Sequence, residues 1–198
     1  MSNRSIHTLL KSWDEECPLT REEAVEVLNL PEEEMDSLME CAYALRTKYK
    51  GKKVSVQLLT NVRSGNCTQN CAYCAQSKDS QAEIEKYKRV SDEKLYGDND
   101  LVDEKHLARH CIGLSGIGFS DEEIEDLADR IREMKKKDTQ ICCSIGFLTE
   151  KQARILKDAG LDRINHNLNS SRSFYPEICT THTYDQRVNN IKMLQSLG

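Results

Sequence analysis

The chain has 198 residues, of which 38% are hydrophobic and 31% are charged, and its formal net charge is −5. This length supports a domain with its own core and excludes a miniature scaffold that depends on crosslinks. No apolar run approaches the roughly 20 residues of a membrane-spanning helix, and the first residues lack the pattern of a secretory signal, so we expect a cytoplasmic protein. The two signs of charge are interspersed, which excludes a basic surface for nucleic acid or an anionic membrane and favours small-molecule partners.

The first part of the chain is predicted to be helical. Thr20 and Glu23 form a capping-box pattern, and the apolar residues that follow fit a short helix that stops before Pro31. A second helix is predicted from about Pro31 to Leu45, and the pattern changes near Gly51. We therefore expect a helical segment over residues 1–50 and a separate domain over residues 51–198.

Strands and helices alternate after residue 51, which is typical of a parallel sheet covered by helices. Strands are predicted at about 54–61, 109–115, 140–146 and 161–167. Helices are predicted to open at Ser120, at Thr149 and near Thr183. The segment 84–109 suggests a helix that Gly97–Asp100 interrupts.

Nine cysteines are many for a protein of a reducing compartment, where clustered thiols more often bind metal or carry chemistry than form disulfides. Cys67, Cys71 and Cys74 stand at spacings of four and three residues in a turn rich in Gly and Asn. Three thiolates suit a 4Fe-4S cluster with one open iron. A zinc site needs a fourth ligand, usually from a second pair of cysteines, and the adjacent Cys142 and Cys143 would point to opposite faces of a strand. A zinc site and three free thiols remain the alternatives to the cluster.

Strand alternation predicts which other side chains face a common interior. Cys111 is expected to face inward from the second strand, whereas in the third strand Cys142 faces inward and Cys143 outward. Other polar residues share the inward set, namely Arg109, Ser115, Ser144, Arg163, Asn165 and Asn167. Barrel interiors are usually filled with bulky aliphatic side chains, so this lining indicates a site.

The stretches SGNCTQNCAYCAQS, RHCIGLSGIGFSDEE and GLDRINHNLNSSRSFYPEICTTHTYDQR resemble the biotin synthase family of the radical S-adenosylmethionine (radical SAM) superfamily, from about residue 40 to the end. The resemblance implies a TIM-type β/α barrel whose 4Fe-4S cluster is held by Cys67, Cys71 and Cys74. It also implies that S-adenosylmethionine binds the open iron, with Tyr73 near its adenine. The implied activity is that of a sulfurtransferase that inserts sulfur into dethiobiotin to form biotin.

The same resemblance implies further ligands and partners. Cys111 and Cys142 match ligand positions of a second iron-sulfur cluster, 2Fe-2S or related. Asn167 matches a residue that contacts dethiobiotin, and Asn169 a position at the ribose of S-adenosylmethionine where some relatives have Asp. An electron donor such as flavodoxin or ferredoxin and a homodimer are also implied.

A complete barrel takes about 250 residues, so the four predicted strand-helix units amount to an incomplete barrel. We expect the N-terminal half of the enzyme, inactive alone; the alternatives are another radical SAM enzyme or a non-catalytic metal-binding fragment. Cys17, Cys41 and Cys179 match no ligand position, and a role for His182 stays open. His166 is expected to be a hydrogen-bonded packing residue.

Overall fold

A computed structural model describes residues 19–198, and the chain forms two compact units, Met1–Val54 and Ser55–Gly198. Cys17 lies outside the described residues. Within the described part, no helix is long and apolar enough to cross a membrane.

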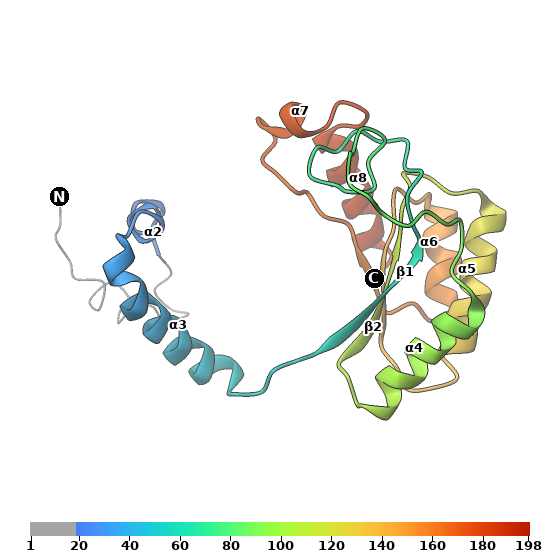
Figure 1. The fold of residues 1–198 in the computed structure, drawn as a ribbon, viewed down its shortest axis with the longest axis horizontal. Coiled ribbons are helices and arrows are strands. Elements are labelled where there is room, and N and C mark those ends of the chain that lie inside the picture. The colour runs from blue at the N-terminus through green and yellow to red at the C-terminus, as the bar shows by residue number, and fades with distance from the viewer. Residues whose placement is uncertain (1–18) are drawn as a thin grey trace. The chain divides into compact units, whose positions relative to one another are not determined.

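The described part of the first unit, residues 19–54, is mainly helical (Figure 1), which agrees with the prediction there. Helix α2, Arg21–Leu28, begins at the predicted capping box, in which Thr20 and Glu23 exchange side-chain and backbone hydrogen bonds. The next helix differs from the prediction in its first turn. Pro31 caps a short 3-10 turn, η1, Glu32–Glu34, and the α-helix α3 runs from Met35 to Lys50 and ends at Gly51, whose φ of +65° favours glycine. Cys41 lies half-buried in α3.

The second unit is built on a four-stranded parallel sheet, and all four predicted strands are confirmed. The strands are β1 (Gln57–Arg63), β2 (Arg109–Leu114), β3 (Ile141–Ser144) and β4 (Arg163–Asn165), hydrogen-bonded in that order. In their register Cys111 pairs with Cys142, and Cys142 pairs with Arg163. Because neighbours in register point to the same side, these residues share one face of the sheet.

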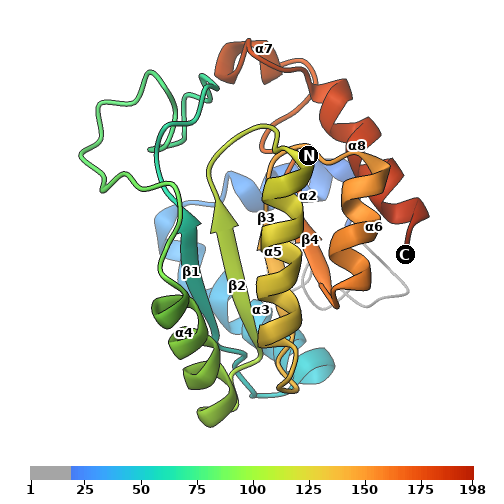
Figure 2. The same cartoon turned by 90° about the vertical axis from the view of Figure 1, so that its right-hand side faces the viewer.

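Helices cover the opposite face (Figure 2). They are α4 (Asp92–Glu104), α5 (Asp121–Met134) and α6 (Glu150–Asp158). The short helix α7 (Tyr175–Ile178) lies beyond the carboxyl ends of the strands, and α8 (Tyr184–Ser196) contacts α6. The predicted openings at Ser120, Thr149 and Thr183 are confirmed, each as a capping box. The core lies between the sheet and these helices, where Ile112 and Cys143 are fully buried. Four strands, each followed by a helix, make this unit an incomplete β/α barrel.

The predicted interruption at Gly97–Asp100 is wrong, because α4 runs through it unbroken. Each polar side chain there has a partner that the sequence did not reveal. Asn99 is buried and donates to the carbonyl of Met134 at 3.1 Å, and Asp98 accepts from the Thr60 hydroxyl at 2.6 Å. These tertiary contacts offset the poor helix propensity of the stretch.

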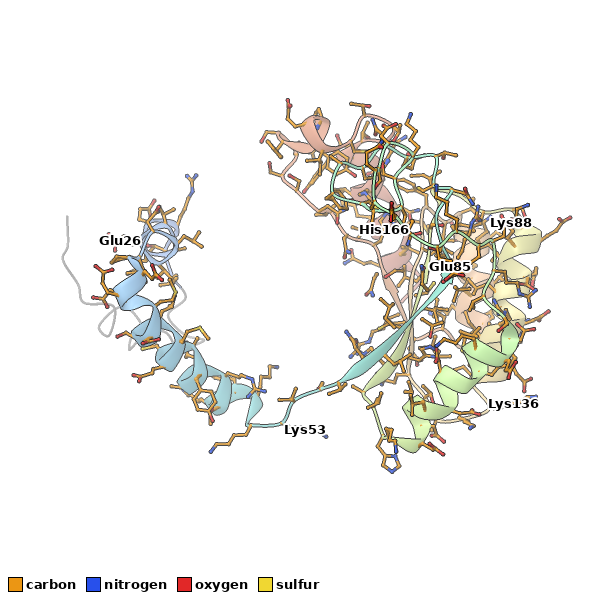
Figure 3. The ribbon with its side chains drawn as sticks, in the orientation of Figure 1. Glu26, Lys53, Glu85, Lys88, Lys136 and His166 are labelled. Atoms are coloured by element: carbon orange, nitrogen blue, oxygen red, sulfur yellow. The ribbon has the colours of Figure 1, made fainter. Side chains whose placement is uncertain are left out.

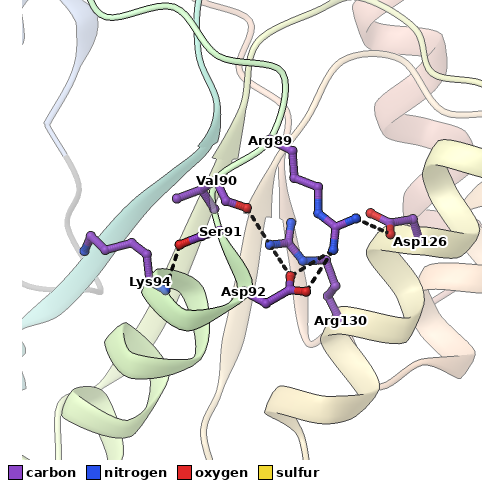
Figure 4. A network of polar contacts seen from close by, with 7 residues as sticks. All are labelled: Arg89, Val90, Ser91, Asp92, Lys94, Asp126 and Arg130. Carbon is purple, nitrogen blue, oxygen red and sulfur yellow. Dashed lines mark hydrogen bonds and ion pairs between the residues drawn. The ribbon is translucent and has the colours of Figure 1, made fainter.

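A network of charged side chains fixes the start of α4 against α5 (Figure 4). Arg130, 3% exposed, donates to the carbonyl of Val90 at 2.9 Å and lies 2.7 Å from Asp92. Arg89 joins Asp92 to Asp126 at 2.9 Å from each. The buried guanidinium is thus neutralised where the chain returns from a long loop to the sheet.

Gly146, just beyond β3, generates a prediction about stability. A Cβ added there would lie 2.3 Å from the backbone oxygen of Ile117, which accepts from Phe147 N at 2.6 Å. Gly146→Ala must separate these two loops, and we expect it to destabilise the fold by about 1–3 kcal/mol in denaturant unfolding. Gly97→Ala is the control, since open space surrounds Gly97 inside a helix; it should stabilise by up to about 1 kcal/mol. Equal effects of the two changes would contradict the prediction.

Candidate functional site

The three clustered cysteines lie in a loop, residues 64–90, that joins β1 to α4 and that we call the cysteine loop. Its base is closed by Ser64 and Tyr87, whose backbones exchange hydrogen bonds at 3.0 and 3.1 Å. Gly65, with a φ of +71°, turns the chain so that its carbonyl accepts from Ser115 and its N–H donates to Gln76, each at 2.6 Å. The loop is therefore fixed to the end of β2.

Asn70 joins the cysteine loop to the segment between α7 and α8. Its Oδ1 accepts from the backbone N–H groups of Thr180 and Thr181 at 3.1 and 3.2 Å, and its Nδ2 donates to the Thr180 hydroxyl at 2.7 Å. Next to it, Ala72 N donates to the carbonyl of Ile178 at 2.9 Å. Two segments more than 100 residues apart in sequence thus form one wall.

A pocket of about 240 Å³ opens beside this wall, at the carboxyl ends of the strands, toward which the arrows in Figure 2 point. This is the end at which β/α barrels build their sites. Six residues predicted from the sequence line the pocket together: Cys67, Cys71, Tyr73, Cys74, Asn167 and Asn169. Gly116, Gly146 and Phe147 complete it from the loops after β2 and β3.

Tyr73 and Asn169, both predicted to contact one cofactor, contact each other. Asn169 Nδ2 donates to the Tyr73 hydroxyl at 2.5 Å. Asn169 has a φ of +66°, a left-handed conformation that Asn tolerates better than most residues. Burial, followed by the neighbouring Cys71, raises the pKa of the Tyr73 phenol, so it stays protonated and able to donate at neutral pH.

Cys111 and Cys142 form a separate thiol pair on the inward face of the sheet, outside the lining of this pocket. Their Sγ atoms are 2.9 Å apart, and Asn165 Nδ2 lies 3.2 Å from Cys142 Sγ. Burial, and then the proximity of Cys142, raises the pKa of Cys111 to about 11. Cys143 packs in the core on the helix side, so the predicted facing of all three cysteines is confirmed.

Sequence reasoning missed a second group of residues at the pocket. Cys179 Sγ lies 3.8 Å from Cys71 Sγ, and His182 Nδ1 lies 3.3 Å from Cys179 Sγ. Arg187 donates to His182 Nε2 at 3.0 Å and to the Tyr175 hydroxyl at 2.5 Å. Both His182 and Arg187 line the pocket. The signal in the sequence is the stretch TTHTYDQR, which contains both His182 and Arg187.

The local environment shifts the pKa values of Cys71 and Cys179 in opposite directions and lowers that of His182. Burial, and then Cys179, raises the pKa of Cys71 to about 11. The pKa of Cys179 is lowered although burial opposes this, because the Thr181 hydroxyl and the N–H groups of His182 and Thr181 favour the thiolate. Burial, helped by Arg187, lowers the pKa of His182 to about 4, so the imidazole is neutral at pH 7.

His166, labelled in Figure 3, differs from the prediction of a hydrogen-bonded packing residue. Both ring nitrogens are shielded from solvent without a well-formed hydrogen bond. The ring instead meets Phe147 edge-on, with the two ring centroids 5.1 Å apart, and it lines the pocket. Burial lowers the pKa of His166, which agrees with a neutral ring in an apolar contact.

The donor set of the cysteine loop fits a multi-iron cluster better than one ion. Within residues 19–198, one group of three Cys, His, Asp or Glu donors has all its ligand atoms within 4.8 Å of each other, and it excludes Cys67 and Cys74. Thiolates that bind different irons of one cluster lie farther apart than thiolates that share an ion. Cys67, Cys71 and Cys74 line one pocket but do not form one compact group of donors, which agrees with that wider spacing.

Residues 61–198 match the family described as the Radical SAM superfamily, and the chain belongs to it. That family implies a 4Fe-4S cluster and S-adenosylmethionine. Among curated relatives, the chain is 39% identical over 181 residues to the biotin synthase of Geobacillus kaustophilus (strain HTA426) and 40% identical over 181 residues to that of Bacillus subtilis (strain 168). These alignments include 91% of this chain and 54% of each relative, so the chain spans about half the length of the curated relatives it matches.

Two solved structures share the fold. Methylornithine synthase (PylB) superposes with a TM-score of 0.81 at 16% identity, over 97% of this chain and 56% of that one. HydG, a maturase of the FeFe-hydrogenase, superposes with a TM-score of 0.68 at 18% identity, over 90% of this chain and 40% of that one. Both matches support an incomplete barrel of the kind predicted.

The contacts of Asn70 generate a prediction about the loop. Asn70→Leu removes the acceptor of the Thr180 and Thr181 amides, and we expect their hydrogen exchange to accelerate roughly fivefold, equivalent to about 1 kcal/mol. Gln81→Leu is the matched control, because the Gln81 side chain makes only a 3.5 Å contact within the same loop. Unchanged protection of both threonines in Asn70→Leu would disprove the role of Asn70.

Proposed function

We propose that this chain supplies the cluster-binding and S-adenosylmethionine-binding half of a biotin synthase, which inserts sulfur into dethiobiotin to form biotin. The observation that carries the proposal is the single pocket that gathers Cys67, Cys71 and Cys74 with Tyr73, Asn167 and Asn169. The identity to curated biotin synthases over 91% of the chain supports the choice of substrate.

In this proposal Cys67, Cys71 and Cys74 hold a 4Fe-4S cluster, one of whose irons stays open. A reduced cluster held there would supply the electron for reductive cleavage of S-adenosylmethionine, which is the radical chemistry that hydrogen abstraction from dethiobiotin would need. The protein's own contribution is to exclude water and fix the cofactor. Phe147, Gly116 and Gly146 line the pocket from the loops after β2 and β3.

Arg187 places a positive charge in the pocket, where it can pair with the carboxylate of S-adenosylmethionine. Its guanidinium lines the pocket from α8 and lies close enough to Cys71 to lower the pKa of that thiol, against the larger effect of burial. A carboxylate is the preferred partner of a guanidinium. We assign Arg187 to the carboxylate of S-adenosylmethionine, Tyr73 to its adenine and the Asn169 amide to its ribose.

The inward face of the sheet suits the second cluster and the substrate. Cys111 and Cys142 are proposed as ligands of a second iron-sulfur cluster, because their thiols already meet on that face. Asn167 is proposed to contact dethiobiotin from the pocket above them. An electron donor such as flavodoxin or ferredoxin, a homodimer and a cytoplasmic site are proposed from the family resemblance, and nine cysteines suit a reducing compartment.

A chimera tests the function. Exchanging the matched segment of the Bacillus subtilis relative for this chain should give a protein that lets a biotin auxotroph grow without biotin. The same chimera with Cys71→Ala should not support growth. A chimera that assembles its iron-sulfur clusters and still makes no biotin would contradict the proposal and favour another radical SAM enzyme.

The first cluster has its own test in the isolated chain. After anaerobic reconstitution with iron and sulfide, we expect broad visible absorption and about four irons at the first site. Alanine at Cys67, Cys71 or Cys74 should abolish both, whereas Cys41→Ala should change neither, because Cys41 lies in the other unit. A colourless protein after reconstitution would instead favour the non-catalytic metal-binding reading.

The second cluster is tested by counting iron in a matched pair of variants. Cys111→Ala and Cys142→Ala should each lose the iron held in excess of the first cluster, while keeping the absorption of the first. Cys143→Ala removes a neighbouring thiol from the other face of β3 and should keep all the iron. Identical iron counts in all three variants would exclude Cys111 and Cys142 as ligands.

A further inference from the structure

We propose that Cys71, Cys179 and His182 form a binding site for one divalent, sulfur-preferring cation such as Zn²⁺, without Cys67 or Cys74. All three side chains are buried, at 8%, 4% and 6% exposure, and their ligand atoms all lie within 4.8 Å of one another. Among the residues that the structure describes, no other three Cys, His, Asp or Glu side chains are so close.

The distances match a tetrahedral ion before any ion is bound. Zinc lies about 2.3 Å from thiolate sulfur and about 2.0–2.1 Å from imidazole nitrogen, so tetrahedral angles separate two thiolates by about 3.8 Å and a thiolate from a nitrogen by about 3.6 Å. Cys71 and Cys179 Sγ are 3.8 Å apart, and Cys179 Sγ lies 3.3 Å from Nδ1 and 3.8 Å from Nε2 of His182.

The orientation of His182 suits a ligand that binds through Nε2. Gln69 Oε1 lies 3.0 Å from Nδ1 and can only accept, so it fixes the proton on Nδ1 and leaves a lone pair on Nε2. Metal-binding histidines commonly donate their second N–H to such an oxygen. The Nε2 lone pair now accepts from Arg187, and a cation would replace that guanidinium, which keeps its contact with the Tyr175 hydroxyl.

The donor types define the class of cation. Two thiolates balance the charge of a divalent ion, and sulfur with imidazole selects zinc-like metals over Mg²⁺ or Ca²⁺. The backbone N–H groups of Thr181 and His182 favour the Cys179 thiolate. Three protein ligands leave a fourth position for water.

Cation and cluster compete, because Cys71 is needed by both. This consequence, unlike the site itself, rests on the proposed function. A chain that carries Zn²⁺ at Cys71 and Cys179 cannot complete the cluster of the cysteine loop until the ion leaves. Because Cys179 contributes to zinc affinity and not to the cluster, it determines how strongly zinc inhibits cluster assembly.

Cobalt provides the direct test, since Co²⁺ in a tetrahedral thiolate site absorbs in the visible range. The chain with Cys67→Ser and Cys74→Ser, reduced with a phosphine under anaerobic conditions, cannot hold the cluster and should still bind one Co²⁺, which Zn²⁺ displaces. Adding Cys179→Val should weaken Co²⁺ binding at least about tenfold. Adding Cys143→Val instead, another buried cysteine, should leave it unchanged.

Several outcomes would overturn the site. Loss of Co²⁺ binding in the double serine variant would assign the ion to the cysteine loop, and loss with Cys111→Ala but not with Cys179→Val would assign it to the thiol pair. A measurement on the unaltered chain guards against misfolded variants. Zn²⁺ should protect Cys71 and Cys179 from alkylation while Cys67 and Cys74 react, and equal protection of all four would refute the proposal.

The competition is measured separately. Preloading the unaltered chain with Zn²⁺ should slow the growth of iron-sulfur absorption during reconstitution, and Cys179→Val should remove most of that delay. If cluster assembly fails in every sample while Co²⁺ still binds as described, the proposed function fails and the cation site stands. If zinc causes no delay although it binds, the competition is disproved.

Discussion

The candidate site depends most on the hydrogen bonds that join Asn70 of the cysteine loop to Thr180 and Thr181. The cysteine loop has almost no regular secondary structure of its own, so its shape comes from what it touches. Asn70 attaches it to the segment that follows α7, Ala72 attaches it to the last residue of α7, and Gly65 attaches it to Ser115 at the end of β2. The three thiols are thereby fixed relative to strands and helices that lie far from them in sequence.

The two faces of the sheet have different roles: the helix side forms the core, and the inward side carries polar groups of the candidate site. The helix side buries Ile112, Ile141 and Cys143 completely, and burial of such side chains contributes most of the free energy of folding. The inward side carries thiols and amides that touch one another, with Leu59 left 67% exposed. Because the core does not rely on the inward side, its residues are free to serve a ligand.

Sequence reasoning succeeded where a local rule applied. Alternation with a period of two was enough to put Cys111 and Cys142 on one face and Cys143 on the other, and capping boxes located three helix starts. It failed at Gly97–Asp100, because the partners that hold that stretch helical come from β1, β2 and α5. The approach of Cys179 to Cys71 likewise spans 108 residues, and no local pattern encodes it.

These sequence separations also order the events of folding. The entropy lost in closing a loop grows with its length, by about 0.6 kcal/mol for each doubling. Cys67, Cys71 and Cys74 can meet as soon as one short stretch of chain is available, whereas Cys111 and Cys142 are 31 residues apart and need two paired strands first. The contact between Cys71 and Cys179 forms later still. A growing chain therefore exposes its three-cysteine loop to the metals of the cell well before the segment that will enclose it has been made.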